Sequence, residues 1–412
     1  MEGKKIWIIG IVAAVLLAVI GMFGMFVWSN RAGAFDPVAV VVADAAEMPT
    51  EKAVGEVPAW EQEDAKEPET AVVRENTGEA ADGEARGAEE TPVITLATEA
   101  QTELEGNAEA EGKETVPGQG TGESGTEPAR EDCVLLFAGD VYLSDHVLNA
   151  YDRAGGIHGV LDDKIRAEIE AADLFVVNQE FPFTERGTKA ADKQYTFRLP
   201  HSRVHLMNEM GIDLVTLANN HILDFGPEGI TDSISALKQA GIRYVGAGED
   251  LNEAKKLEIV EIGGQTIGFL GLSRVYMAAS WAAGAGHPGV FSTYDLTLPL
   301  EEIRKADALV DHLVVYVHWG VERETSPKDY QRSMGQQYID AGADIVIGSH
   351  PHVLQPLEYY KDKLIMYSLG NFVFGSSIPN TELLKIVLGA DGSMTITEIP
   401  CTSSGGYTRM KE

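Results

Sequence analysis

Carboxylate, amide and imidazole side chains follow five short apolar segments of this chain. Oxygen and imidazole ligands of this kind suit Mn, Fe or Zn ions, whereas soft metals favour thiolates. Two such ions about 3.5 to 4 Å apart can share one bridging carboxylate. The candidate ligands that follow the segments are Asp140, Glu180, Asn220, His318, His350 and His352.

Divalent ions held by these residues would support a hydrolytic reaction. They activate water as a nucleophile and stabilise the oxyanion that develops at a phosphorus or carbonyl centre. Asp224 follows His221 by three residues and is placed to orient its ring, so His221 is the candidate acid for a leaving group. Each residue alone also fits a structural role in a turn, a cap or the core. Their accumulation in one part of the chain favours a site.

The segment His350-Pro351-His352 predicts two imidazoles that project together. Proline fixes its own φ and pushes the preceding residue toward extended backbone. Side chains two residues apart in an extended chain share a face, and Gly348 and Ser349 leave room for close approach. The alternative is a surface turn that contains two histidines.

The elements that must position these residues alternate between apolar strands and amphipathic helices, which predicts an α/β domain. Ligands of α/β sheets gather at the carboxyl ends of strands, where the candidate ligands stand. The predicted strands are 134–137, 174–177, 214–217, 243–245, 313–317 and 345–347, and the predicted helices are 164–172, 228–240, 301–309 and 328–341. Two antiparallel pairs, 257–262 with 266–272 and 384–388 with 394–399, make the expected sheet system mixed.

The N-terminal segment, residues 1–31, is predicted to contain a single membrane anchor. Residues 6–28 form an uncharged stretch of 23 residues, long enough at about 1.5 Å per residue to cross a hydrocarbon core of roughly 30 Å. Lys4 and Lys5 would keep the N-terminus cytoplasmic and send the rest of the chain outside the cell. A cleaved signal peptide is the alternative, because residues 32–34 have the small-x-small form of a processing site.

The rest of the chain divides by charge and apolar content. Residues 32–130 contain 24 acidic and six basic side chains, which predicts a disordered, self-repelling linker. Residues 131–402 form the working domain, and residues 403–412 form a tail.

The formal net charge of −32 excludes nucleic acid as a partner, because the basic footprint is missing. The sequence holds no G-x-S-x-G elbow and no Walker loop. Its two cysteines, Cys133 and Cys401, are either bridged or inert core residues.

Six motifs follow one another between about residues 133 and 400. They are Phe137-Ala138-Gly139-Asp140, Asn178-Gln179-Glu180, Asn219-Asn220-His221 with Asp224 and Gly226, His318-Trp319-Gly320-Val321-Glu322, Gly348-Ser349-His350-Pro351-His352 and Tyr367-Ser368-Leu369-Gly370-Asn371-Phe372. In this order they resemble the CapA family of poly-γ-glutamate capsule synthesis proteins, which is similar to calcineurin-type metallophosphoesterases. The resemblance implies a two-sheet α/β/β/α sandwich of metallophosphoesterase type, with a dinuclear site at one edge, in a membrane-anchored extracellular domain.

The resemblance also implies roles for individual residues. The six candidate ligands would bind one or two divalent ions, with Glu180 in the bridging position and His221 as the acid. Arg198 would contact an anionic substrate, and Asn371 would shape the floor of the site. Two departures from the related phosphoesterases weaken the first metal position: Tyr142 stands where they usually carry His, and Glu180 stands where they use Asp.

The implied ligand is poly-γ-glutamate or another anionic polymer, handled together with membrane-bound synthase subunits. Two hypotheses are open. The domain either cleaves or transfers an amide or phosphoester bond with metal, or it holds the polymer without catalysis and assists the synthase. Because the domain is itself net negative, bound cations and Arg198 would have to attract such a polymer locally.

Overall fold

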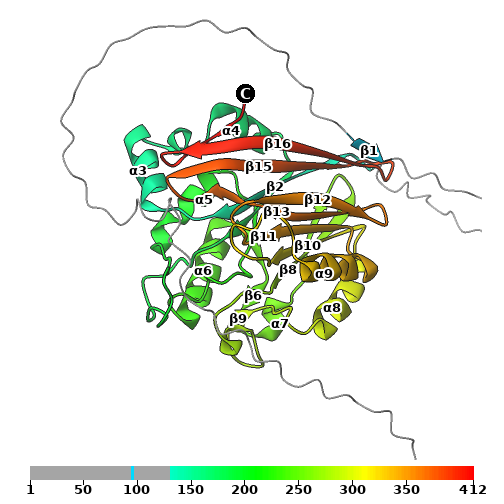
Figure 1. Cartoon of the computed structure of the whole chain (residues 1–412), viewed down its shortest axis with the longest axis horizontal. Helices are drawn as coiled ribbons and strands as arrows, with labels where there is room; N and C mark the ends of the chain where they lie inside the picture. The colour runs from blue at the N-terminus through cyan, green and yellow to red at the C-terminus, as the bar shows by residue number, and fades with distance from the viewer. Residues whose placement is uncertain (1–93, 97–129) are drawn as a thin grey trace, which may run out of the picture. The chain divides into compact units, whose positions relative to one another are not determined.

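The computed structural model describes residues 94–96 and 130–412, and the predicted membrane helix and most of the predicted linker lie outside them. Within the described part, no helix combines the length and apolar character needed to cross a membrane. The described strands form a sheet of nine, a sheet of six and a short pair, flanked by helices (Figure 1). The mixed α/β class predicted from the sequence is therefore confirmed for this part of the chain.

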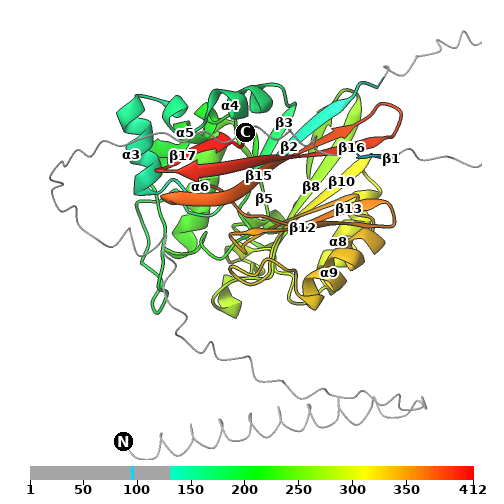
Figure 2. The ribbon, with the colours of Figure 1, turned by 45° about the horizontal axis from the view of Figure 1, so that its top comes forward.

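The nine-stranded sheet has a parallel centre and an antiparallel flank. Its strands are β1 (Ile94–Leu96), β2 (Cys133–Val141), β3 (Leu174–Gln179), β4 (Leu214–Thr216), β5 (Arg243–Val245), β14 (Asn371–Val373), β15 (Ser377–Leu388), β16 (Met394–Ser404) and β17 (Tyr407–Met410). β2 to β5 run parallel in chain order, and β14 adds parallel to β2. β15 pairs antiparallel with both β2 and β16, and β1 and β17 each pair with β16 (Figure 2).

The six-stranded sheet is parallel at its centre and antiparallel at both edges. Its strands, in sheet order, are β12 (Leu354–Tyr360), β13 (Lys363–Leu369), β11 (Ile345–Ser349), β10 (His312–His318), β8 (Gln265–Ser273) and β7 (Glu258–Ile262). β13, β11, β10 and β8 run parallel, while β12 and β7 close the edges as hairpins. The separate pair consists of β6 (Ala247–Gly248) and β9 (Gly289–Val290).

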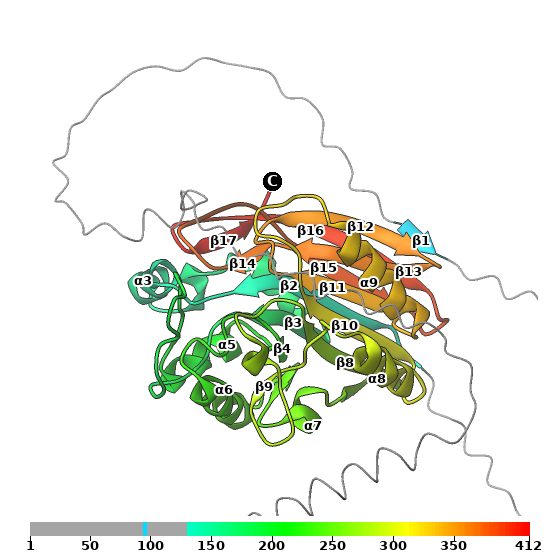
Figure 3. The ribbon, with the colours of Figure 1, turned by 60° about the horizontal axis from the view of Figure 1, so that its bottom comes forward.

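The two sheets pack face to face, with helices on their outer faces. The α-helices are α3 (Asp145–Ala154), α4 (Asp163–Glu170), α5 (His205–Glu209), α6 (Pro227–Ala240), α7 (Leu251–Ala254), α8 (Thr297–Asp307) and α9 (Asp329–Asp340). α3 to α6 cover the nine-stranded sheet, and α8 and α9 cover the six-stranded sheet (Figure 3). The fold thus has four layers in the order helix, sheet, sheet, helix.

The alternation of side chains along the strands explains these layers. In β2, Leu135 and Phe137 point into a core shared with Tyr316 of the other sheet, whereas Leu136 joins the cluster under the helices. In β10, Val314 and Tyr316 lie in the shared core, and their neighbours pack against α8 and α9. Successive residues of a strand face opposite sides, so strands buried on both faces read as continuous apolar runs.

Aspartates that precede the parallel strands fix their register. Each lies just before one strand, and its carboxylate accepts the backbone N–H near the start of the neighbouring strand at 2.8 Å. The four residues are Asp173, Asp213, Asp311 and Asp344. Because register is set at the amino ends, the opposite, carboxyl ends come to lie level with one another.

Of the two alternatives for the cysteines, the structure supports inert core residues and excludes the bridge. Both thiols are free and buried. Cys133 lies opposite Leu388, whereas Cys401 lies opposite Thr381, seven positions away along β15. At about 3.3 Å per residue, this separation far exceeds the Cα distance that a disulfide can span. The inert alternative agrees with their burial in the core.

Candidate metal centre

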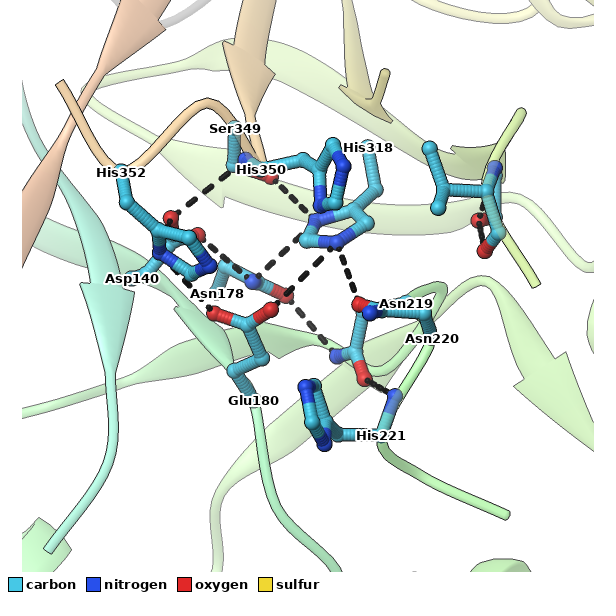
Figure 4. A network of polar contacts seen from close by, with 12 residues as sticks. Asp140, Asn178, Glu180, Asn219, Asn220, His221, His318, Ser349, His350 and His352 are labelled. Carbon is cyan, nitrogen blue, oxygen red and sulfur yellow. Dashed lines mark hydrogen bonds and ion pairs between the residues drawn. The ribbon is translucent and has the colours of Figure 1, made fainter. Parts of the chain in front are cut away.

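The candidate ligands meet where parallel strands of both sheets end. Asp140 lies opposite Asn178 in the register of β2 and β3, and His318 lies opposite Ser349 in that of β10 and β11. Figure 4 shows the carboxylates of Asp140 and Glu180 and the imidazoles of the candidate histidine ligands turned toward one centre. Five of the six predicted ligands fall into groups whose ligand atoms lie within 4.8 Å of one another; these five are Asp140, Glu180, His318, His350 and His352.

Glu180 lies at the middle of this arrangement. Its side chain is fully buried, and neither carboxylate oxygen accepts a hydrogen bond. Its Oε1 lies 3.5 Å from His318 Nε2, and its Oε2 lies 3.8 Å from His352 Nδ1. Burial, together with the nearby Asp140 charge, raises the pKa of Glu180 well above its usual range. A buried carboxylate without donors requires a cation to stay charged.

Asp140 is the second buried carboxylate, and two neighbouring side chains hold it in place. Asn178 Nδ2 donates to its Oδ1 at 2.8 Å, and its Oδ2 lies 3.3 Å from His352 Nδ1. The preceding residue must be glycine, because a Cβ at Gly139 would lie 1.8 Å from the carbonyl oxygen of Gly370. This close approach lets β14 lie against β2 at the level of the site.

Two of the imidazoles are buried and favour the neutral form. His318 Nδ1 lies 2.9 Å from Ser349 Oγ, and His318 Nε2 lies 2.9 Å from Asn220 Oδ1. His350 Nδ1 is buried without a hydrogen-bond partner. Burial and the neighbouring imidazoles lower the pKa of both His318 and His350. Neutral imidazole is the form that binds metal ions.

His352 differs from the other two imidazoles in its charge. Burial lowers its pKa, but the Glu180 and Asp140 carboxylates outweigh burial and raise it to about 10. Its Nδ1 also lies 2.7 Å from Asn371 Oδ1. A positively charged His352 therefore lies directly beside the Glu180 and Asp140 side chains.

The donor set fits divalent ions. Glu180 belongs to two of the three groups, one with His318 and His350 and the other with Asp140 and His352. The third group joins His350 and His352 to Glu322, which is exposed. The unpartnered oxygens of Glu180 and the unpartnered Nδ1 of His350 are the atoms that such ions would satisfy.

The prediction of an extended His350-Pro351-His352 segment is wrong. His350 has a φ of 96° and His352 a φ of 57°, both in the left-handed region. The chain must turn sharply here between β11 and β12, and Arg323 N–H holds the turn by donating to Pro351 O at 2.8 Å. Proline disfavours the right-handed helical region for the residue before it but does not impose an extended one. The turn still brings the two imidazole rings to 5.9 Å.

His221 and Asp224 form a second buried group next to the ligands. His221 Nδ1 lies 2.7 Å from Asp224 Oδ2, the contact that their spacing predicts. Phe197 N–H donates to the same oxygen at 2.7 Å, and the Phe197 ring stacks on the imidazole at 4.2 Å. Burial and the nearby Lys193 lower the pKa of His221 to about 4, so its ring is neutral near pH 7.

Lys193 completes this group and was not predicted. Its Nζ donates to Asp224 Oδ1 at 2.5 Å and to the carbonyl oxygen of Asn220 at 2.5 Å, and lies 3.0 Å from His221 Nδ1. Its side chain is only 10% exposed, and burial lowers its pKa. A lysine between polar residues in a loop gives no sequence signal for such burial, because lysines are usually solvated.

The Asn219-Asn220-His221 segment combines a turn with a site contact. Asn219 Oδ1 accepts the backbone N–H groups of His221 and Ile222, each at 3.0 Å, as in an Asx-type turn. The next residue, Asn220, instead reaches His318 with its side chain. Asn219 therefore stabilises the turn, whereas Asn220, the next residue, contacts the site.

Arg198 and Asn371, the predicted substrate contacts, lie in different surroundings. Arg198 is exposed, and its guanidinium lies 4.2 Å from the centre of the Phe225 ring. Among the described residues, no hydrogen bond or ion pair joins Arg198 to the candidate ligands. Asn371 is 5% exposed and contacts His352, so it lies within the cluster.

Comparison with known proteins decides the family of this chain. The family model of the bacterial capsule synthesis protein PGA_cap matches residues 134–376, more than half of the sequence. The chain belongs to the PGA_cap family. The matched segment runs from β2 to the loop before β15, so it includes every candidate ligand described above.

Similar PGA_cap relatives occur in two Bacillus species. The capsule biosynthesis protein CapA of Bacillus anthracis is 31% identical over 286 residues, which cover 67% of this chain and 69% of that protein. The PGA biosynthesis protein CapA of Bacillus subtilis is 35% identical over 252 residues, which cover 60% of this chain and 64% of that protein.

Solved structures resemble the PGA_cap chain more distantly. The NAD nucleotidase NadN of Haemophilus influenzae has a TM-score of 0.40 and 12% identity, covering 65% of this chain and 55% of that one. The sulfate thiohydrolase SoxB of Thermus thermophilus has a TM-score of 0.39 and 14% identity, covering 66% and 57%.

Other residues of the PGA_cap site were not assigned from the sequence. Asn178 connects the two sheets, since its Nδ2 donates to Asp140 and lies 3.4 Å from His318 Nδ1. Ser349 orients His318, and Glu322 adds a third carboxylate to the candidate groups. All three stand inside the motifs quoted above, so strand-end position was the signal that pointed to them.

Proposed function

We propose that this protein acts in the synthesis, export or processing of a poly-γ-glutamate capsule through a divalent-metal site of metallophosphoesterase type. The names of the two Bacillus relatives support the capsule role. The observation that carries the metal site is the Glu180 carboxylate, which is fully buried among imidazoles without a hydrogen-bond donor. The substrate would be the polymer, or another anionic polymer, presented by membrane-bound synthase subunits.

The proposed ligands are Asp140, Glu180, Asn220, His318, His350 and His352, with Glu180 shared between two positions. The ions would be Mn, Fe or Zn, because the donors are oxygens and imidazole nitrogens. A divalent ion bound there supplies Lewis-acid chemistry at a phosphoryl or carbonyl oxygen. The proposal places the domain outside the cell, tethered by residues 6–28.

The remaining residues orient the reaction. Asp224 and Lys193 hold the Nδ1 side of the His221 ring, so Nε2 is the nitrogen that exchanges a proton with a leaving group. Phe197 fixes the plane of the ring by stacking on it. Asn371 holds His352, and Arg198 at the exposed rim attracts the anionic chain.

A non-catalytic, polymer-binding role is the second candidate, and one observation favours it. Tyr142 stands where related phosphoesterases usually carry an imidazole. Its ring stacks on Phe197 at 4.1 Å and packs edge-on against Phe374 at 5.5 Å. This position therefore belongs to an aromatic cluster and supplies no nitrogen ligand, which weakens one of the two metal positions.

One experiment separates the two candidates. The purified protein is analysed for bound metal and assayed with a generic phosphodiester and with poly-γ-glutamate, before and after treatment with a chelator. Stoichiometric metal with chelator-sensitive turnover is the expected result. Metal without turnover on either substrate would support the binding role, and the absence of metal after incubation with Mn, Fe and Zn would refute the metal site.

A further inference from the structure

Arg274 lies at the end of β8, directly beside the metal centre. In the register of the six-stranded sheet, Ser273 lies opposite His318. The Arg274 N–H then donates to the backbone carbonyl of His318 at 2.8 Å. Its side chain therefore starts one strand away from a candidate ligand, at the same edge of the sheet.

The guanidinium of Arg274 is held by aromatic rings and has no anionic partner. It lies 3.7 Å from the centre of the Tyr294 ring and 5.9 Å from that of Tyr330. Its Nη1 atom is buried, and no hydrogen bond or ion pair of the guanidinium occurs within the described residues. A buried donor without an acceptor costs free energy that a bound acceptor would restore.

Half of the twelve arginines in the described part of this acidic chain are paired with carboxylates. Six arginines in the described part form ion pairs: Arg130, Arg166, Arg186, Arg203, Arg243 and Arg332. Arg332 is the closest parallel to Arg274, because it also lies over a tyrosine ring, that of Tyr367, yet it is paired with Glu358 at 2.6 Å. Aromatic stacking alone therefore does not explain the missing partner of Arg274.

Hydrogen bonds and a ring contact hold the aromatic frame in place, and Tyr294 is exposed. The Tyr330 hydroxyl accepts the Gly320 N–H at 2.8 Å and donates to the Gly320 carbonyl at 3.0 Å, two residues after His318. The Tyr276 ring supports Tyr294 at 5.0 Å. Tyr294 is 53% exposed and Arg274 only partly buried, so a ligand can approach from solvent. Stacking fixes the plane of the guanidinium and leaves its N–H edge for an oxyanion.

We propose that Arg274, framed by Tyr294 and Tyr330, binds one carboxylate of the polymer segment that leads into the metal centre. Residues 275–281 and 292–294 contain no basic residue. On the Tyr330 side, Lys328 and Arg332 are paired with Glu324 and Glu358 at 3.1 and 2.6 Å, so Arg274 offers the unpaired positive charge among these described segments. One guanidinium matches one carboxylate, through two parallel hydrogen bonds. The identity of the polymer rests on the proposed function, whereas the anion subsite does not require bound metal.

The test is equilibrium binding of a γ-linked glutamate oligomer to the full chain, with chelator and at fixed ionic strength. Arg274→Gln should raise the Kd about tenfold or more, as expected for losing a charge-assisted hydrogen bond. The matched control Arg332→Gln should leave the Kd unchanged, because its charge is already paired. An oligomer with amidated carboxylates should bind the wild type as weakly as the acidic oligomer binds Arg274→Gln.

Two variants of Tyr294 distinguish a loss of binding from a loss of folding. Tyr294→Ala should raise the Kd and Tyr294→Phe should not, with both thermal midpoints near that of the wild type, because this ring is exposed. The proposal is overturned by equal Kd values for wild type and Arg274→Gln, by no saturable binding to the wild type, or by inorganic phosphate competing more strongly than acetate. If the protein never retains metal while binding still depends on Arg274, the metal function fails and the subsite stands.

Discussion

Asp224 and Glu180, two of the three buried carboxylates in and beside the site, differ in their hydrogen bonds. Asp224 receives Lys193 Nζ on one oxygen and Phe197 N–H on the other, so its charge is stabilised within the protein. Glu180, equally buried, receives no donor on either oxygen. Buried polar groups are usually satisfied. At the residue scale, the missing donors of Glu180 are the clearest sign that the folded chain is built to hold a cation.

Substituting Glu180 with glutamine should remove metal and leave the fold intact. The amide keeps the volume of the side chain but lacks the charge and the bridging capacity of a carboxylate. Even supporting residues of metal sites change affinity by ~10 to 100-fold, so we expect the affinity to fall at least about tenfold. Elemental analysis after dialysis measures this loss. Glu382→Gln, at another buried glutamate, is the control, and full metal retention by Glu180→Gln would contradict the assignment.

His221 and His350 should have separable effects. His221→Asn should lower phosphodiester turnover by about 10²-fold, the usual contribution of proton transfer, with unchanged metal content. His350→Ala should remove metal as well as turnover, with a thermal midpoint near that of the chelator-treated wild type, because its Nδ1 makes no hydrogen bond to lose. Parallel metal analysis and kinetics of the two variants provide the measurement. Loss of metal from His221→Asn would mean that this ring is a ligand.

At the scale of elements, the sequence predicts the strands better than the connections. The apolar runs of β2, β3, β10 and β11 and the helices α6 and α9 lie where periodicity places them, with ends shifted by a few residues. α6, for example, begins at Pro227 and ends before Gly241, the usual helix-start and helix-stop residues. α3, β12 and β13 were not predicted. β12 is mostly half-buried and lacks a clear apolar pattern, whereas β13 is buried at six of its seven residues, so its apolar run was a signal that the sequence did contain.

The parts of the site that the sequence did not reveal depend on turns and on burial. A proline after His350 predicts extended backbone only if tertiary contacts agree, and here the turn into β12 decides. The burial of Lys193 results from contacts with residues 27 to 31 positions away, which no local pattern contains. By contrast, Asp140, Glu180 and His318 follow strands directly, so their meeting could be predicted.

The close contact between β2 and the residue that precedes β14 should not tolerate a side chain. Gly139→Ala would place a methyl group 1.8 Å from Gly370 O, so the two strands must separate or the backbone must shift. We expect a loss of at least about 2 kcal/mol in the free energy of unfolding, measured with urea. Gly335→Ala is the control, because its added methyl would lie 3.2 Å from the Ile365 side chain, within a helix. Equal stability of the two variants would show that the backbone at this contact is flexible.

Glu382 in β15 should make the domain less stable as pH rises. Burial, aided by the nearby Glu398, raises the pKa of Glu382 to about 8, above its ordinary value of 4.5. A folded-state pKa above the unfolded one favours folding fully below about pH 4.5, and this contribution is lost as pH rises through about 8. Its size is on the order of a few kcal/mol. Unfolding at pH 5 and pH 9 should show a smaller loss for Glu382→Gln than for the wild type.

At the scale of the whole molecule, the chain is acidic while its proposed ligand is also an anion. A formal net charge of −32 repels a polyanion at long range, and attraction is left to cations and arginines near the site. We therefore expect the association rate constant for poly-γ-glutamate to rise with NaCl from about 20 to 150 mM, as the Debye length shortens. Stopped-flow fluorescence measures it, and a rate that falls with salt would point to an unrecognised basic surface.

The position of the site between the two sheets has a mechanical consequence. Glu180 extends from one sheet, whereas His318 and His350 extend from the other, and their ligand atoms lie within 4.8 Å of one another. A single ion bound by these three side chains would link the two sheets to each other. Removal of the ion by a chelator would then weaken the contact between the two sheets. The rate at which proteases degrade the domain would therefore depend on the local concentration of the metal ion.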